Sequence, residues 1–228
     1  MKILIVSATL FEVKKLFKRS EPVVVIPNHL YHFNMGRLQV DLLAPGIGLL
    51  HTAFYMGKRI REGSYHVAIN AGICGAYNSE VTIGSVLHVT QEQLPEQGVD
   101  KDDAFRSLFE LGLLPPDEYP FEDGKLINIL VPKLKSIDRL KIVTGNTVNM
   151  MQTDPARIKK LLKRSPADVE SMEGAAFLFS CLVEKIPCAQ IRAVSNYVGE
   201  RDKEKWEIRL AVKNLDGVLV EILEEMKE

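Results

Sequence analysis

The sequence predicts an α/β protein in which helices cover both faces of a central sheet. Two observations support this class. Short segments rich in Val, Ile and Leu alternate along the chain with longer segments whose apolar residues recur every three or four positions. Strands that alternate with helices are typical of a largely parallel sheet whose strands are buried on both faces.

Short apolar runs bounded by Gly, Pro, Asn or charged residues predict the strands. These runs are 2–8, 22–27, 38–46, 65–72, 85–91, 140–145 and 188–196. The first run, KILIVSA, is brief, and the polar residues Thr9 and Glu12 soon follow it. It is therefore interpreted as a strand and not as a signal peptide.

Helical periodicity predicts the helices. The periodic segments are 11–17, 51–62, 155–163, 171–184 and 206–226. In the fourth segment, Ser171 is the expected N-cap. Residues 91–127 form an irregular excursion, and long loops in compact domains tend to be functional or to cover something. We expect one domain over residues 1–228 that contains this excursion.

The composition argues against several classes of function. Lys and Arg number 29 and Asp and Glu number 30, so the net charge of −1 gives no reason to expect nucleic acid or an anionic membrane as a partner. No apolar run approaches the roughly 20 residues of a membrane helix. The three cysteines contain no CxxC pair and the five histidines lack metal-ligand spacing. We therefore expect a reduced, cytoplasmic protein without a metal or cofactor.

Glu12 has a structural and a catalytic interpretation. Residues 9–12 fit the capping box, in which the glutamate accepts a hydrogen bond from the backbone amide of the cap residue. Glu12 also lies just past the end of the first predicted strand, and ligands of α/β sheets bind beyond the carboxyl ends of the strands. Both interpretations stay open on this pattern alone.

Glu173 and Asn196 also have two interpretations each. The helix dipole favours an acid in the first turn, where Glu173 is expected. Its apolar neighbours, however, exclude water from the carboxylate, and the hydroxyls of a sugar diol would supply the missing hydrogen bonds. Gly174 would let that diol come close. Asn196 ends an apolar strand and is either a turn residue or an amide directed into a pocket. The glycine cluster at 70–76 either cradles a ligand or forms a turn.

Four motifs, taken in order, resemble the nucleoside phosphorylase superfamily. VESMEGAAF at 169–177 resembles its Val-Glu-Met-Glu-Ala segment, and RAVSNYV at 192–198 resembles its Arg-Ala-x-Ser-Asp segment. The start of the chain is similar to that of the methylthioadenosine/S-adenosylhomocysteine nucleosidases, with PGIG and NAGICGA following in the expected order. The segment SNYVGERDKEKWEI, the DVESMEGAAF motif and the 91–127 excursion are similar to the futalosine hydrolases.

The resemblance implies a single-domain, three-layer α/β/α fold with a mixed, twisted central sheet. It implies cleavage of futalosine to hypoxanthine and dehypoxanthinyl futalosine, on the futalosine route to menaquinone. In that reaction Glu12 activates water as the general base, Glu173 accepts hydrogen bonds from the ribose hydroxyls and Asn196 stabilises the departing purine. Glu170 is not expected to contact the substrate. The other implied substrate-binding residues are Gly72, Ile73, Val148, Asn149, Met172 and Ser195.

Three residues depart from patterns of the superfamily. Adenosine-type nucleosidases have Asp where this chain has Asn196, and an amide N–H can donate to the carbonyl of a 6-oxopurine such as hypoxanthine. Phosphorylases have a hydroxyl residue where this chain has Ile73, and they hold phosphate with arginines that the segment before Lys14 lacks. Water is therefore favoured over phosphate as the nucleophile. Val148 replaces an aromatic residue that stacks on the base.

Other functions remain as alternatives. They are a methylthioadenosine-type nucleosidase, a purine or uridine phosphorylase, and a non-catalytic nucleoside-binding protein. An Arg or Lys should pair with the carboxylate of futalosine, but the sequence does not select one. The superfamily implies a homo-oligomer, with a dimer favoured.

Overall fold

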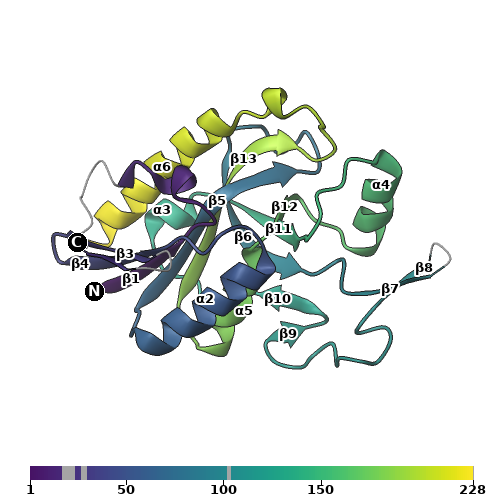
Figure 1. Ribbon diagram of the computed structural model, residues 1–228, viewed down its shortest axis with the longest axis horizontal. Coiled ribbons are helices and arrows are strands. Elements are labelled where there is room, and N and C mark those ends of the chain that lie inside the picture. The colour runs from purple at the N-terminus through teal and green to yellow at the C-terminus, as the bar shows by residue number, and fades with distance from the viewer. Residues whose placement is uncertain (17–23, 27–29, 102–103, 228) are drawn as a thin grey trace.

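The computed structural model describes residues 1–16, 24–26, 30–101 and 104–227, and its centre is a mixed sheet (Figure 1). The strands run in the order β2-β3-β4-β1-β5-β12-β11-β6-β10-β9, and β13 pairs with both β5 and β6. Their bounds are β1 Lys2–Val6, β2 Val24–Ile26, β3 Leu30–Met35, β4 Leu38–Leu43, β5 Val67–Ala76, β6 Val86–Gln93, β9 Phe121–Glu122, β10 Lys125–Ile127, β11 Lys141–Thr147, β12 Val169–Ser171 and β13 Cys188–Tyr197.

Helices lie on both faces of this sheet, which confirms the three-layer α/β/α prediction (Figure 1). The helical elements are η1 Leu10–Val13, α2 Leu49–Glu62, α3 Lys135–Asp138, α4 Pro155–Arg164, α5 Gly174–Val183, η2 Lys203–Lys205 and α6 Ile208–Glu225. Helices α3 and α6 cover one face, and α2 and α5 cover the other. No helix in the described part of the chain is long and apolar enough to cross a membrane.

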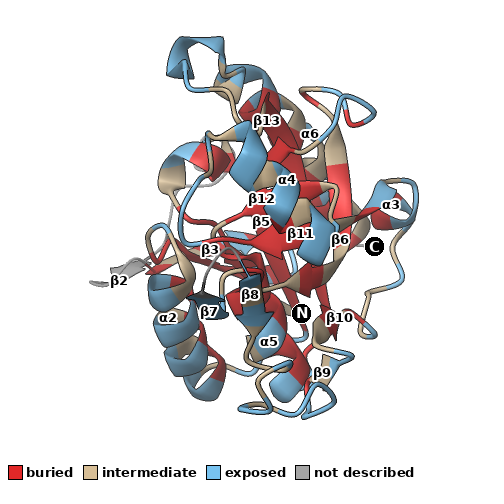
Figure 2. Cartoon of the chain, turned by 90° about the vertical axis from the view of Figure 1, so that its right-hand side faces the viewer, coloured by how far each residue is buried: buried red, intermediate tan, exposed pale blue. Residues whose placement is uncertain are grey.

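Strand β1 shows why two helical layers form. Its Ile3 and Ile5 belong to the apolar cluster beneath α6, whereas Leu4 belongs to the cluster beneath α2 and α5. Successive side chains of a strand point to opposite faces, so a continuously apolar strand needs a cover on each side. Figure 2 shows the result, with buried strands inside and exposed outer surfaces on α2, α4 and α5.

The excursion at 91–127 contains two small hairpins. Strands β7 (Gly98–Lys101) and β8 (Ala104–Ser107) pair with each other, away from the main sheet. Strands β9 and β10 extend the main sheet at its edge beside β6. The rest of the excursion is irregular, as its Pro- and Gly-containing sequence predicts.

Two predicted boundaries near the motifs were wrong. The helix expected from Ser171 starts at Gly174, because residues 169–171 form β12, which pairs in parallel with β11 and antiparallel with β5. The strand expected over 65–72 continues to Ala76, so the glycine cluster lies inside β5 instead of forming a turn. In both cases pairing with a distant strand decides the structure, which local periodicity does not report.

Other boundaries also differ from the predictions. The helix expected at 11–17 is a short 3-10 turn at Leu10–Val13, and residue 17 is outside the described residues. Strand β3 was not predicted, although it pairs along its whole length with β4. Residues 22–23 and 27 of the second predicted strand also lie outside the described residues.

Gly174 has a different function from the one the sequence suggested. A Cβ atom at this position would lie 2.0 Å from Glu92 Oε1 and 2.6 Å from Gln190 Nε2, both of which are buried. Gly174 therefore makes room for a polar group beneath α5, and not for a sugar. The Glu92 carboxylate also accepts a hydrogen bond from Thr147 Oγ1 at 2.7 Å.

The substitution Gly174→Ala should lower the free energy of unfolding by about 1–3 kcal/mol, because the methyl group overpacks this buried cluster. Gly217→Ala in α6 is the matched control, since nothing lies within 4 Å of its Cβ position. There alanine should stabilise the protein by about 0.5–1 kcal/mol through its helix propensity. Urea denaturation of both variants measures the two effects, and equal effects of the same sign would contradict the assignment.

Candidate active site

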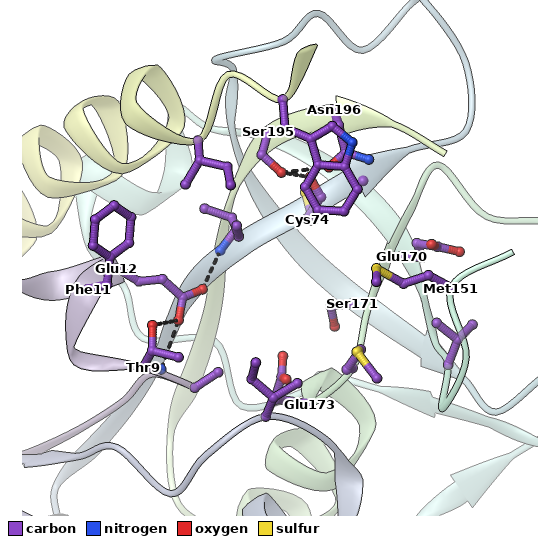
Figure 3. Close-up of a pocket in the computed structure, with 18 of the residues that line it drawn as sticks. Thr9, Phe11, Glu12, Cys74, Met151, Glu170, Ser171, Glu173, Ser195 and Asn196 are labelled. Carbon is purple, nitrogen blue, oxygen red and sulfur yellow. Dashed lines mark hydrogen bonds between the residues drawn. The ribbon is translucent and has the colours of Figure 1, made fainter. Parts of the chain in front are cut away.

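A cavity of about 370 Å³ lies beyond the carboxyl ends of β1, β5 and β13, where ligands of α/β sheets bind (Figure 3). The cavity contains most of the residues selected from the sequence. It is lined by Ala8, Thr9, Phe11, Glu12, Ile47, Ile73, Cys74, Gly75, Val148, Met151, Glu170, Ser171, Met172, Glu173, Ser195, Asn196, Lys203, Trp206 and Ile208. No cluster of His, Cys, Asp and Glu that could hold a metal ion occurs among the residues that the structure describes.

Glu12 makes the capping contact and also lines the cavity. Its Oε2 accepts hydrogen bonds from the Thr9 amide at 2.9 Å and the Thr9 hydroxyl at 3.1 Å, so the back-reaching bond of a capping box is present. Its Oε1 accepts from the Ile73 amide at 3.0 Å and faces the cavity (Figure 3). Burial raises the pKa of Glu12, against the lowering effects of the Ile73 amide and the Arg192 guanidinium. The cap thus fixes a carboxylate whose proton affinity is increased.

Glu173 lies at the opening of α5, across the cavity from Glu12 (Figure 3). Its Oε1 accepts a hydrogen bond from the Gly48 amide at 3.0 Å, and its Oε2 lies 3.5 Å from Arg192 Nη1. Gly48 has a φ of 101°, a conformation that glycine adopts readily, and this turn directs the amide at the start of α2 toward Glu173. The second glycine of PGIG therefore binds a carboxylate of the chain itself.

Arg192 is a site residue that the residue-by-residue reasoning did not select. It lies on β13 with 1% of its surface exposed. One nitrogen of its guanidinium donates to Asn70 Oδ1, and another lies near Glu173 Oε2 and the Ile73 carbonyl. The available signal was a single charged residue inside the apolar strand segment AQIRAV, because a buried arginine needs acidic and polar partners.

Gly72 makes this arrangement possible without lining the cavity. A Cβ atom at Gly72 would lie 2.4 Å from Arg192 Nη1 and 3.0 Å from Glu12 Oε1. The arginine and the glutamate therefore meet over the bare backbone of β5. Glycine in a strand often marks such a close approach.

Asn149, like Gly72, does not line the cavity, whereas Ile73, Val148, Met172 and Ser195 do. It is exposed, its backbone amide donates to Glu96 Oε2 at 2.6 Å, and it borders a separate groove between α2, α5 and the excursion. Its neighbour Val148 is buried and lines the cavity. Substrate contact by Asn149 therefore stays a prediction without a geometric basis here.

Asn196 is held by its neighbours in one orientation. Ser195 Oγ donates to Asn196 Oδ1 at 2.7 Å, and Asn196 Nδ2 donates to the Tyr197 carbonyl at 3.1 Å. An amide nitrogen carries two hydrogens, so one N–H of Nδ2 stays free for a ligand. The Tyr197 carbonyl, which can only accept, thus fixes the side of the amide that carries Nδ2, and Asn196 is a hydrogen-bond donor at the cavity wall.

A family model described as the phosphorylase superfamily matches residues 2–224. The chain belongs to the phosphorylase superfamily. Among its relatives, a futalosine hydrolase of Thermus thermophilus is 28% identical over 186 residues, which cover 80% of each chain. A 5′-methylthioadenosine/S-adenosylhomocysteine nucleosidase of a Geobacillus species is also 28% identical, over 242 residues and 100% of each chain.

A solved structure supports the fold of this superfamily member. A mutant futalosine hydrolase of Helicobacter pylori superposes on the chain with a TM-score of 0.79 and 16% identity, over 99% of both chains. This likeness confirms the predicted nucleoside phosphorylase-like α/β fold. The resemblance that the motifs indicated is confirmed by the family match.

Removing the guanidinium with Arg192→Met should lower the free energy of unfolding by about 3–5 kcal/mol, because two buried carboxyls lose their cation. The loss should be larger at pH 8 than at pH 5. Glu12 has a raised pKa in the folded state, so folding takes up a proton and stability falls as pH rises through the interval above its unfolded pKa. Without Arg192 the pKa of Glu12 in the folded state rises further, so the pH interval over which stability falls becomes wider.

Arg139→Met is the control for this pH dependence, because Arg139 pairs with Glu221 at the exposed surface. Its effect should be about 0–1 kcal/mol and nearly the same at both pH values. Denaturation curves at pH 5 and pH 8 provide the measurement. A pH-independent loss in Arg192→Met would contradict the electrostatic role.

Proposed function

We propose that this chain is an N-ribosyl hydrolase that cleaves futalosine to hypoxanthine and dehypoxanthinyl futalosine, as a step toward menaquinone. The observation that carries the proposal is the placement of two buried carboxylates, Glu12 and Glu173, opposite an amide donor, Asn196, in one cavity. The relatives named nucleosidase and futalosine hydrolase support the reaction class. The choice of substrate rests on the cavity itself.

Cleavage of an N-glycosidic bond develops positive charge on the sugar and negative charge on the departing base. Glu12 is the general base that takes a proton from the attacking water, and its raised pKa makes it a better proton acceptor. Glu173 lies where it can accept hydrogen bonds from the ribose hydroxyls, which strengthen as the ring becomes cationic. Met172 packs against the sugar beside it.

Hypoxanthine suits the base end of the cavity. The free N–H of Asn196 Nδ2 can donate to the 6-carbonyl of the purine, whereas the amino group of adenine would present another donor to it. The Tyr197 carbonyl can only accept a hydrogen bond, so the opposite orientation of the amide would place Oδ1 against it and lose the 3.1 Å hydrogen bond from Nδ2. This asymmetry favours a 6-oxopurine over adenine.

The cavity lining also includes aromatic side chains and one cation, which suit an aromatic, anionic substituent. Phe11 and Trp206 are aromatic residues of the lining, and Lys203 is the only Lys or Arg of the lining within the described ranges. We assign to Lys203 the carboxylate of the futalosine arm. Methylthioadenosine carries no such charge, so this cation favours futalosine between the two classes of substrate that the relatives suggest.

Water fits the cavity better than phosphate does. Phosphate needs hydroxyl and guanidinium donors, but Ile73 provides an apolar side chain at the glycine cluster. The guanidinium of Arg192 is engaged by Glu173 and Asn70. Hydrolysis is therefore favoured over phosphorolysis.

A homodimer and a cytoplasmic location complete the proposal. The apolar residues Leu50, Phe54 and Phe179 are exposed on the adjacent helices α2 and α5, and such groups of side chains commonly mark interfaces. Cys74, Cys181 and Cys188 are free and buried, which is in line with a reducing compartment.

The decisive assay incubates the protein with futalosine, inosine and methylthioadenosine, each with and without phosphate, and measures release of free base by chromatography. Futalosine should release hypoxanthine at the same rate in both conditions. Dependence on phosphate would identify a phosphorylase, and preferential release of adenine would identify a methylthioadenosine-type nucleosidase. Absence of turnover with every nucleoside would identify a binding protein.

Exchange of the amide for a carboxylate in Asn196→Asp should reverse the preference for the base. The ratio of kcat/KM for futalosine over its 6-amino analogue should fall by about 10²–10⁴, because a buried mismatched hydrogen-bond site discriminates strongly. Ser195→Ala removes the hydroxyl beside Asn196 Oδ1 but leaves the hydrogen bond to the Tyr197 carbonyl, so it should reduce the ratio less. An unchanged ratio in Asn196→Asp would show that Asn196 does not contact the base.

A further inference from the structure

Gly75 on β5 brings Glu170 and Asn196 together at the cavity. Glu170 on β12 is the partner of Gly75 in one ladder, and Asn196 on β13 is its partner in the other. A Cβ atom at Gly75 would lie 3.4 Å from Asn196 Nδ2 and 3.6 Å from Glu170 Cγ. The two side chains therefore reach over the glycine from both sides, and both line the cavity.

The Glu170 carboxyl is buried but not saturated with hydrogen bonds. Only 7% of the residue is exposed. Its Oε2 accepts a hydrogen bond from the Tyr77 hydroxyl at 2.8 Å. Among the described residues no partner occupies Oε1, so this oxygen is free to carry a proton and to contact a ligand.

Asn196 cannot supply the proton that a departing purine needs. An amide can donate a hydrogen bond to a purine, but it cannot transfer a proton to it as a carboxylic acid can. A departing purine anion needs a proton, and proton transfer from a positioned acid speeds such a step by about 10²–10⁴. Glu170 is the carboxyl that lies beside Asn196 at the same glycine.

We propose that Glu170 is the general acid that protonates the departing purine, next to the amide of Asn196. The inference rests on the proposed nucleosidase function and deepens it. It differs from the expectation made from the sequence, in which Glu170 does not contact the substrate.

The step balances within the reaction. The bond between C1′ of the ribose and the purine nitrogen breaks, and its electron pair stays with the purine, which takes the proton of the Glu170 carboxyl. A lone pair of the water oxygen forms the new bond to C1′, and Glu12 takes one proton from that water. After product release, Glu12 loses its proton to solvent and Glu170 regains one, which restores both groups.

The surroundings keep the Glu170 carboxyl protonatable near neutrality. Burial, the largest cause, and the charge of Glu96 raise its pKa to about 7, against the lowering effect of the Tyr77 hydroxyl. Lys203 and the buried thiol of Cys74 are the other ionisable groups that share this part of the cavity wall. A general acid with a pKa near the working pH is the most effective.

A leaving group that needs no proton provides the test. In Glu170→Gln, kcat with futalosine or inosine should fall by about 10²–10⁴, whereas hydrolysis of p-nitrophenyl β-D-riboside should change by less than about tenfold, because nitrophenolate leaves unprotonated. Glu12→Gln should impair both substrates. Glu80→Gln, an exposed carboxyl, is the control and should impair neither.

The pH profile is the second measurement. Activity needs the protonated form of Glu170, so wild-type kcat/KM for futalosine should fall as pH rises above about 7. Tyr77→Phe removes a donor to the carboxylate, raises the pKa of Glu170 and should move this limb to higher pH. This variant keeps the proposal testable if Glu170→Gln does not fold.

Three results would overturn the proposal. They are wild-type kcat in Glu170→Gln, an equal loss with the nucleoside and the nitrophenyl riboside, and an unmoved alkaline limb in Tyr77→Phe. A wild-type protein that releases no base from any nucleoside would overturn the nucleosidase function itself. The measurement on the wild-type protein thus distinguishes failure of the Glu170 proposal from failure of the nucleosidase function.

Discussion

The buried guanidinium of Arg192 is the interaction on which the rest of the site depends. A charge with 1% of its residue exposed is stable only with partners that replace water, and here these are Glu173, Asn70 and the backbone of Ile73. The same charge lowers the pKa of Glu12, which burial raises. One cation on β13 therefore pairs with Glu173 and partly offsets the effect of burial on the pKa of Glu12 across the cavity.

Glycines of β5 determine how close these groups come. Gly72 leaves room for Arg192 and Glu12, and Gly75 leaves room for Glu170 and Asn196. Each pair consists of side chains from different elements that meet over a backbone without a Cβ atom. The alternation of a strand places positions 72 and 75 on opposite faces in a regular ladder, but the register shift of β13 between Val194 and Asn196 falls at this point. Gly75 lines the cavity directly, whereas Gly72 acts through the side chains of Arg192 and Glu12.

The site divides the chemistry into an ionic part and a neutral part. Glu12, Glu173 and Arg192 form the ionic part, which suits water activation and a cationic sugar. Asn196 and the protonatable Glu170 form the neutral part, which suits an uncharged 6-oxopurine that becomes anionic on departure. Relatives with different named substrates have the same identity to this chain, so overall similarity does not select among them. The residues beside the proposed purine position, Asn196 and Glu170, therefore determine which substrate is favoured.

The sequence by itself determined the α/β class, most of the central strands and the residues Glu12, Glu173 and Asn196, because apolar periodicity and short motifs are local properties of the chain. The tertiary structure decided the rest. It placed Ser171 at the end of a strand, turned Gly174 toward Glu92 and set Asn149 outside the cavity. Arg192 and Glu170 acquire their roles through partners 119 and 93 residues away in the chain. No local pattern reports such contacts, since they exist only once the strands have paired and the glycines between them have left space.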